Sequence, residues 1–385
     1  MLLKNAIIYT MEAQTIPRGY VQISGSKITA LGPMEQCPPD EQGTIDLEGR
    51  AVYPGFVDAH CHMGMFEEGL AFEGDDGNEM TEPVTPHLRG LDAINPNNRS
   101  FLEAAEAGVT TVVTGPGSAN PISGQFCAMK TYGKVVDKMV FRQPAAMKFA
   151  LGENPKATYN EKGQTPTTRM AIAALIREEL QKALRYMEDC QKAQEDEETD
   201  PPEFDAKSEA LLPVLKGEVK AHFHCHRADD IFTAIRLAKE FGLEYVLIHC
   251  TEGHLVAEEL AQEQVKIVCG PLMTTRSKPE LANATDANPG ILNRAGLKVA
   301  ICTDYSVLPI GFLPISAGFA VREGMEYMEA LKAITIYPAQ ICGIDDRVGS
   351  IAVGKDADLV VFSADPLTIA AKAEMVFING KKVKG

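Results

Sequence analysis

An alternation of short apolar runs with helical segments, between residues 53 and 344, limits the fold more than any other feature. The apolar runs include GVTTVVTG, AAMKFALG, EVKAHFHCH, EYVLIHC, VKIVCGP and KVAICTD, and the helical segments include RSFLEAAEA, DDIFTAIRLAKEFG and HLVAEELAQE. Such alternation predicts a parallel sheet with crossover helices. About eight units in this span favour a closed (β/α)8 TIM-like barrel over an open sheet, with functional groups at the C-terminal strand ends.

The two ends of the chain share a different pattern, in which short β-rich runs are separated by glycine turns. The N-terminal part contains NAIIYTM and GYVQISGSKITALG, and the C-terminal part contains GSIAVGKDADLVV and EMVFINGKKVKG. INGK is a hairpin-turn signal. We predict that residues 1–52 and 345–385 form one small β-sandwich domain beside the barrel of residues 53–344. The alternative is that each set decorates the barrel edge separately.

Charge and cysteine content restrict the partners and the compartment. The net charge of −16 argues against nucleic acid or an anionic membrane surface as partner. No long apolar run or signal-peptide pattern is evident. The nine cysteines show no CxxC pair, which indicates free thiols in a reducing, cytoplasmic setting. The acidic stretch 191–209, which follows a long amphipathic helix, is interpreted as a solvated insertion.

Histidines are concentrated at the ends of predicted strands. His60 and His62 follow VYPGFVDA, and further histidines end two later strands: His222, His224, His226 and His249. Residues two apart on a strand point the same way, about 6.6 Å apart. Zinc binds imidazole and carboxylate groups and keeps one position open for water in catalytic sites. The pattern of strand-end histidines predicts a divalent-metal site. If His60 and His62 were considered alone, they could instead be two histidines buried in the core.

Asp304, at the end of LKVAICTD, completes the predicted chemistry. A bound divalent ion lowers the pKa of water to about 7. The Asp304 carboxylate would hold the ion, accept the water's proton and pass it to the leaving group. These groups together indicate a metal-dependent hydrolase.

The run VYPGFVDAHCH, the later strand-end histidines, the terminal CTD and the split small domain resemble the amidohydrolase superfamily. More narrowly, the chain resembles its imidazolonepropionase-related branch over essentially its whole length, including GSIAVGKDADLVV. The resemblance implies a distorted barrel with metal at its mouth and is compatible with a homo-oligomer. It implies these ligands: His60 and His62 from the first strand, His249 from the sixth and Asp304 from the eighth.

Two ligand positions stay open. His222 and His226 lie about 13 Å apart along the fifth strand, too far to share one ion. The resemblance favours His224 as ligand, with His226 as the alternative or as a group facing substrate. His222 is then expected to be a core histidine with its hydrogen bonds satisfied.

The fourth strand decides the number of metal ions. Many relatives carry a lysine there whose carbamate bridges two metals, and Lys148 in AAMKFALG occupies a comparable place. A lysine snorkelling to solvent is the alternative, and Glu153 is an alternative bridging ligand. We expect Zn²⁺, with two ions if Lys148 is carboxylated or Glu153 bridges, and otherwise one.

Several polar residues near the predicted site are candidates to contact a small-molecule substrate. Arg227 would bind a carboxylate unless it pairs with Asp229 or Asp230. The other candidates follow predicted strands or lie in the long loop 63–99: His226, Glu252, His254, His87 and Arg89.

The predicted function is hydrolysis of a C–N bond in an amide, cyclic amide or imidazolone-like molecule. The alternative is deamination of a purine- or pyrimidine-type heterocycle. Deaminase relatives place a glutamate three residues after the fifth-strand histidine, whereas this chain has Arg227 or Asp229 there. A third interpretation, an inactive scaffold, conflicts with the presence of every expected ligand type.

Overall fold

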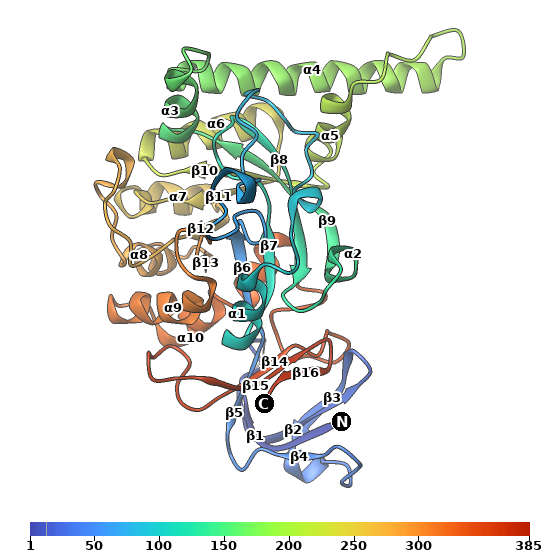
Figure 1. Cartoon of the computed structure of the whole chain (residues 1–385), viewed down its shortest axis with the longest axis vertical. Coiled ribbons are helices and arrows are strands. Elements are labelled where there is room, and N and C mark those ends of the chain that lie inside the picture. The colour runs from blue at the N-terminus through green and yellow to red at the C-terminus, as the bar shows by residue number, and fades with distance from the viewer. Residues whose placement is uncertain (13) are drawn as a thin grey trace.

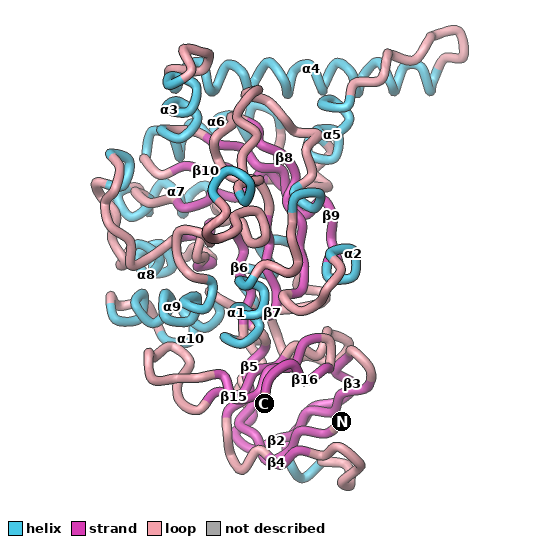
Figure 2. Tube along the Cα trace, viewed as in Figure 1, coloured by secondary structure: helices cyan, strands magenta, loops and turns pink. Residues whose placement is uncertain are grey.

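The computed structural model describes residues 1–12 and 14–385. Its strands gather in two separate sheets, and most of its helices lie around the larger one (Figure 2). The small sheet lies at one end of the molecule and holds both chain termini, while the long helix α4 crosses the opposite end (Figure 1). The barrel lies between them.

Strands from both ends of the chain join in the small sheet, whose order is β16-β15-β14-β5-β1-β2-β3, with β4 paired to β1. β5 pairs in parallel with β1 and antiparallel with β14, which links the two ends. The structure therefore confirms a composite β domain instead of two edge decorations. Its strands are β1 (Leu2–Ile8), β2 (Ile16–Ser24), β3 (Lys27–Pro33), β4 (Ile45–Asp46), β5 (Ala51–Pro54), β14 (Leu359–Phe362), β15 (Ala373–Ile378) and β16 (Lys381–Lys384).

The larger sheet has the order β13-β12-β11-β10-β9-β8-β7-β6, which follows the chain and confirms the barrel. Its two edge strands meet where Asp58 Oδ2 accepts hydrogen bonds from Thr303 N at 2.9 Å and Thr303 Oγ1 at 2.6 Å. The barrel strands are β6 (Phe56–Cys61), β7 (Val109–Thr114), β8 (Ile122–Lys130), β9 (Val140–Ala150), β10 (Lys220–Cys225), β11 (Tyr245–His249), β12 (Ile267–Cys269) and β13 (Val299–Ile301).

Strand β8 departs from the expected parallel arrangement, because it pairs antiparallel with both β7 and β9. Only residues 115–121 separate β7 from β8. A parallel crossover needs a dozen or more residues, whereas a short connection suffices for an antiparallel pair. The segment ISGQ (residues 122–125) is therefore the start of a barrel strand.

The helices α1 to α11 follow the chain mostly between barrel strands. The first five are α1 (Arg99–Ala107), α2 (Val136–Met139), α3 (Glu153–Glu161), α4 (Arg169–Glu195) and α5 (Ala206–Leu215). The remaining six are α6 (Ala228–Phe241), α7 (Ala257–Glu263), α8 (Asn288–Arg294), α9 (Leu313–Arg322), α10 (Tyr327–Lys332) and α11 (Ile336–Cys342). Six 3-10 turns add η1 (Met34–Gln36), η2 (Ala71–Gly74), η3 (Gly90–Ala93), η4 (Gly253–Leu255), η5 (Pro279–Leu281) and η6 (Ile310–Phe312).

Helix α4 is amphipathic only over its first half. It buries Ile172, Ile176 and Leu180 on one face, whereas residues 191–205 beyond its packed part are largely exposed. Figure 1 shows this end of α4 and the following loop projecting from the body. Residues 191–205 agree with the expected solvated insertion, whereas residues 206–209 belong to α5, where Ser208 is buried. Of the helices in the described ranges, none is long and apolar enough to cross a membrane.

A buried ion-pair cluster joins the two sheets. Lys130, at the end of β8, lies with its Nζ 3.0 Å from Asp356 Oδ2 and 2.5 Å from Asp358 Oδ2. All three side chains are buried. We expect Lys130→Met to lower the free energy of unfolding by about 3–5 kcal/mol, because it leaves the buried Asp358 carboxylate without its cation. Denaturant unfolding monitored by circular dichroism measures this loss.

Lys27→Met is the matched control for Lys130→Met. Lys27 Nζ contacts the same Asp356 at 2.7 Å, but its side chain is 43% exposed. Exposed ion pairs contribute about 0–1 kcal/mol, so this substitution should change stability little. Equal effects of the two substitutions would contradict a special contribution from the buried lysine.

Candidate metal centre

Two groups of metal-ligating side chains meet at the mouth of the barrel. The first group consists of His60 and His62 at the end of β6 and Asp304 after β13; the second consists of His224, His226 and His249. Within each group, the potential ligand atoms lie within 4.8 Å of one another. Asp304 Oδ1 lies 3.3 Å from His62 Nε2 and 3.6 Å from His60 Nε2. The structure thus brings together histidines that are up to about 190 residues apart in sequence.

Backbone carbonyls fix the orientation of two of these rings. His62 Nδ1 lies 2.7 Å from the carbonyl oxygen of Gly115, and His249 Nδ1 lies 2.6 Å from that of Gly270. A carbonyl oxygen only accepts hydrogen bonds, so Nδ1 carries the proton in both rings and Nε2 presents a lone pair. This is the arrangement that metal-binding histidines require.

The buried imidazoles of His60 and His224 are neutral and lie near a carboxylate anion. Burial lowers the pKa of His60 and His224 well below the usual value, and nearby Lys148 adds to the effect. Burial raises the pKa of Asp304, but His249, His62 and Lys148 outweigh it and hold the pKa below its usual range. Metal ligands must be deprotonated in this way. Asp304 Oδ1 is also buried without a hydrogen-bond partner in the described structure. The residues therefore fit a divalent ion.

Lys148 on β9 lies inside the barrel beside the first group. Its side chain is fully buried, and its Nζ lies 3.0 Å from His60 Nε2. Burial lowers the pKa of Lys148 to about 8. The side chain does not snorkel to solvent. It occupies the position that the resemblance assigns to the bridging lysine.

The alternative bridging residue Glu153 is not brought to either group. Glu153 is the first residue of α3, and its Oε2 lies 3.4 Å from the backbone N–H of Glu280. The helix start directs this carboxylate toward the loop after β12 and away from Lys148. The expectation of a glutamate bridge at Glu153 is therefore corrected.

Most of the substrate-side candidates lie away from the cavity. Arg227 is exposed and pairs with Asp229, with Nη2 2.7 Å from Oδ2, as the alternative interpretation had it. Glu252 Oε2 accepts a hydrogen bond from the backbone N–H of Ala228 at the start of α6. Their charges are already satisfied locally. Three further candidates also do not line the cavity: His87, Arg89 and His254. Only His226 of this set faces the site.

The interpretation of His222 as a hydrogen-bonded core histidine is wrong. The ring is fully buried, but neither of its nitrogens has a hydrogen-bond partner in the described part of the chain. Its partner on the neighbouring strand β9 is Lys148. Burial, with the charge of Lys148, lowers the pKa of His222 to about 3, so the ring is neutral.

Three cysteines alternate with the ligands and pack away from them. Cys61, Cys225 and Cys250 belong to buried apolar clusters of the core. Burial raises the pKa of each thiol. Protonated, buried thiols are poor nucleophiles, which fits a packing role.

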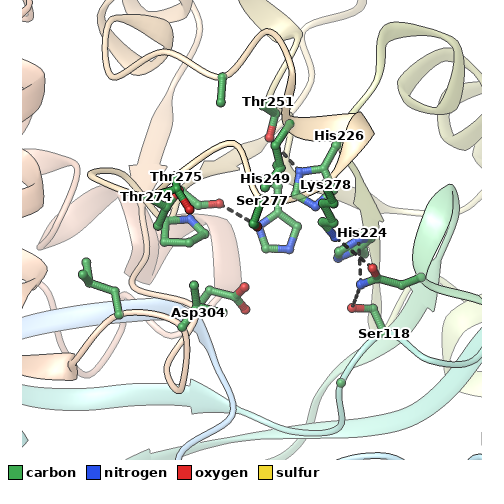
Figure 3. A pocket seen from close by; sticks show the side chains of 18 of the residues that line it. Ser118, His224, His226, His249, Thr251, Thr274, Thr275, Ser277, Lys278 and Asp304 are labelled. Carbon is green, nitrogen blue, oxygen red and sulfur yellow. Dashed lines mark hydrogen bonds between the residues drawn. The ribbon is translucent and has the colours of Figure 1, made fainter. Parts of the chain in front are cut away.

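His62, Asp304 and the three histidines of the second group line a cavity of about 1100 Å³, whereas His60 is fully buried and does not line it. Figure 3 shows His224, His226, His249 and Asp304 facing this space. Much of the surrounding wall carries hydroxyl groups, which include those of Ser118, Thr251, Thr274, Thr275 and Ser277. Such a wall offers both donors and acceptors to a polar small molecule.

Three residues that extend the second group were missed in the sequence. Glu280 Oε1 lies 3.5 Å from His226 Nε2 and 2.6 Å from Lys278 Nζ. Lys278 Nζ also donates to Asn154 Oδ1 at 2.8 Å, and Asn154 Nδ2 lies 3.4 Å from His224 Nε2. All three come from loops or helix starts, where SKPEL and GENPK carry no periodic signal. Only their positions in the segments that follow the barrel strands β9 and β12 could have pointed to them.

A barrel with histidine and carboxylate groups converging at its mouth defines the class of metal-dependent hydrolases. A sequence model of the Amidohydrolase family matches residues 51–383. The chain belongs to this family, whose members typically bind a divalent metal, and it is a hydrolase that acts on C–N bonds.

Individual relatives agree with this placement. Amidohydrolase tasK of Hapsidospora irregularis is 28% identical over 366 residues; the match covers 89% of this chain but only 37% of that protein. Imidazolonepropionase of Fusobacterium nucleatum is 25% identical, with 95% of this chain and 91% of that protein covered. The crystal structure of an amidohydrolase from Thermotoga maritima MSB8 is 41% identical, has a TM-score of 0.95 and covers 99% of both chains. These matches support the imidazolonepropionase-related branch.

Proposed function

We propose that this protein hydrolyses a C–N bond in an amide, a cyclic amide or an imidazolone-like small molecule. One observation carries the proposal: His60, His62 and Asp304 converge beside a large cavity that His62 and Asp304 line, with a buried lysine next to His60. The similarity to imidazolonepropionase supports the choice of substrate class.

His60, His62, His224, His249 and Asp304 are the proposed ligands of Zn²⁺, with Lys148 as a further ligand when carboxylated. When bound, the ion supplies Lewis-acid polarisation of a carbonyl oxygen and acidifies water. The His62 and His249 rings keep their Nε2 lone pairs directed at the site because their Nδ1 protons are bonded to backbone carbonyls. Two ions are expected with a carboxylated Lys148.

Asp304 is the proposed proton carrier of the reaction. Its carboxylate is anionic and aimed at the two histidines, and it lines the cavity where a substrate would lie. In this role it accepts a proton from the attacking water and donates it to the leaving nitrogen. The hydroxyl-bearing wall orients the substrate by hydrogen bonds.

A substrate panel tests the proposed reaction. Purified protein, supplied with Zn²⁺ and bicarbonate, is assayed on amides, cyclic amides and imidazolones, and separately on aminopurines and aminopyrimidines. Hydrolysis of the first set is the expected result. Ammonia release from the second set alone would contradict the proposal and support the deaminase alternative.

Removal of metal should stop turnover. We expect dialysis against a chelator to lower kcat by at least about 100-fold, because the acidified water is lost. Added Zn²⁺ should restore the rate, and Mg²⁺, which prefers oxygen ligands, should not. Full activity in protein shown by elemental analysis to be metal-free would contradict the metal requirement.

A further inference from the structure

Glu280 places a second buried carboxylate against the second histidine group. It lies in the loop after β12, within η5, and its side chain is only 1% exposed. Its Oε1 lies 3.5 Å from His226 Nε2 and 3.9 Å from His224 Nε2. The proposed reaction does not use this carboxylate, and a buried anion needs a cation or a set of donors to balance it.

The distances match those expected between two ligands of one ion. Donor atoms on a tetrahedral zinc with bonds of about 2.0–2.1 Å lie about 3.3 Å from one another. In the first group, the Asp304 Oδ1 distances to the two histidines are 3.3 and 3.6 Å. In the second group, the Glu280 Oε1 distances are 3.5 and 3.9 Å. Glu280 thus lies at distances from its two histidines similar to those of Asp304, although Lys278 also contacts its Oε1.

The surrounding chain holds this carboxylate in place. Glu280 Oε2 accepts a hydrogen bond from the backbone N–H of Glu153 at 3.0 Å. Gly152 has a φ of 86°, and a Cβ there would lie 2.8 Å from Glu280 Oε2. A glycine therefore makes the close approach of the carboxylate to the start of α3 possible.

Lys278 shares the Glu280 oxygen that faces the histidines. Its Nζ lies 2.6 Å from Glu280 Oε1, and its side chain lines the cavity. A carboxylate oxygen accepts more than one partner, so the ammonium leaves a lone pair for an ion. His226 Nδ1 lies 2.7 Å from Thr251 Oγ1, which leaves Nε2 as the ring atom directed at Glu280.

We infer that Glu280 is the carboxylate ligand of a second divalent-metal position, formed with His224 and His226, while His249 lies between this position and the first. The inference rests on the proposed function, because it assumes that the first group binds metal. It assigns both His224 and His226 as ligands, so the choice between them disappears. It also gives the second ion an anionic ligand of its own, whether or not Lys148 is carboxylated.

Metal content and affinity test this assignment. Wild type, Glu280→Gln and the matched control Lys278→Met are saturated with Zn²⁺, desalted and measured by elemental analysis. Competition with a chromogenic chelator then gives the affinity of each site. We expect about two ions per chain in wild type and in Lys278→Met. Glu280→Gln should retain about one ion and bind the second at least about 100-fold more weakly.

The outcomes separate this inference from the proposed function. Two ions with unchanged affinity in Glu280→Gln would overturn the inference, as would a single ion in wild type that the substitution does not affect. Loss of the ion in Lys278→Met to the same extent would also overturn it, because the ion pair would then explain the effect. In each of these cases the proposed hydrolysis would stand. Wild type without any metal would overturn the proposed function itself.

A second variant at Glu280 keeps the test valid if Glu280→Gln does not fold. A double variant measures the coupling between Glu280 and His226. Circular dichroism and thermal melting establish whether Glu280→Gln folds; if it does not, Glu280→Asp, which keeps the charge but withdraws the oxygen, replaces it. The affinity loss of the double variant with His226→Asn should differ from the sum of the two single losses, because both residues would bind the same ion. Additive losses would contradict a shared ion.

Discussion

Asp304→Asn should lower kcat by at least about 1000-fold in protein that still folds and still contains metal. General acid–base groups contribute about 100- to 10,000-fold, and Asp304 would serve in both directions of proton transfer. Asparagine keeps the shape of the side chain but cannot take up the proton. Because Asp304 lies 3.3 Å from His62, the substitution also weakens the first metal position, so turnover is measured at saturating Zn²⁺ with metal content determined in parallel.

Asp229→Asn serves as the control for Asp304→Asn. This carboxylate is exposed, pairs with Arg227 and lies outside the cavity, so its removal should leave kcat within a factor of about two. An Asp304→Asn variant that kept more than a tenth of wild-type turnover would exclude Asp304 as the proton carrier.

The first ligand group could be predicted because strand geometry dictates it. In a strand, alternate residues share a face, so Asp58, His60 and His62 must point the same way once VYPGFV is read as a strand. The barrel then gathers strand ends at one mouth, which brings Asp304 to the two histidines. The alternation of side chains along a strand, and the rule that functional groups lie at the C-terminal ends of barrel strands, were enough to predict the first ligand group.

The second group could be predicted only in part, because its outer residues come from connections. Glu280 and Lys278 belong to the loop between β12 and α8, and Asn154 belongs to α3. Loop conformation depends on long-range packing, such as the contact of Glu280 with the Glu153 backbone. No sequence period marks such a contact. The antiparallel β8 was missed because a short apolar run bounded by Gly and Pro reads equally well as a loop.

The failures at Arg227 and His222 have opposite causes. Arg227 is near the site in sequence, but Asp229 satisfies its charge on the surface. His222 lies inside the barrel, where the chain offers its ring no hydrogen-bond partner in the described structure. In both cases the sequence placed the residue correctly relative to the fifth barrel strand. It could not predict which side chains would contact that residue in the folded protein.

Lys148→Met should lower turnover by at least about 100-fold and, in metal-free protein, raise the free energy of unfolding by roughly 1–3 kcal/mol. Burial of an ammonium group is costly, and the nearby Asp304 carboxylate offsets only part of this cost, since the pKa of Lys148 is still lowered. Lys148 makes no ion pair with any residue that the structure describes; its Nζ contacts His60 and lies 5.6 Å from the Phe126 ring centroid. Methionine fills a similar volume without the charge, so stability should rise while the site loses a ligand.

Lys220→Met is the matched control for Lys148→Met, since both lysines lie on neighbouring barrel strands. Lys220 Nζ donates a hydrogen bond to the carbonyl oxygen of Ile341 at 2.5 Å and lies at the start of β10, away from the ligands. Its loss should cost about 0.5–1.5 kcal/mol and leave kcat unchanged. Both stabilities are measured by denaturant unfolding with chelator present, because bound metal would add its own stabilisation. If the Lys148→Met variant is less stable and fully active, the lysine contributes only to the stability of the fold. If the variant is more stable and inactive, Lys148 lowers the stability of the barrel but is required for its activity.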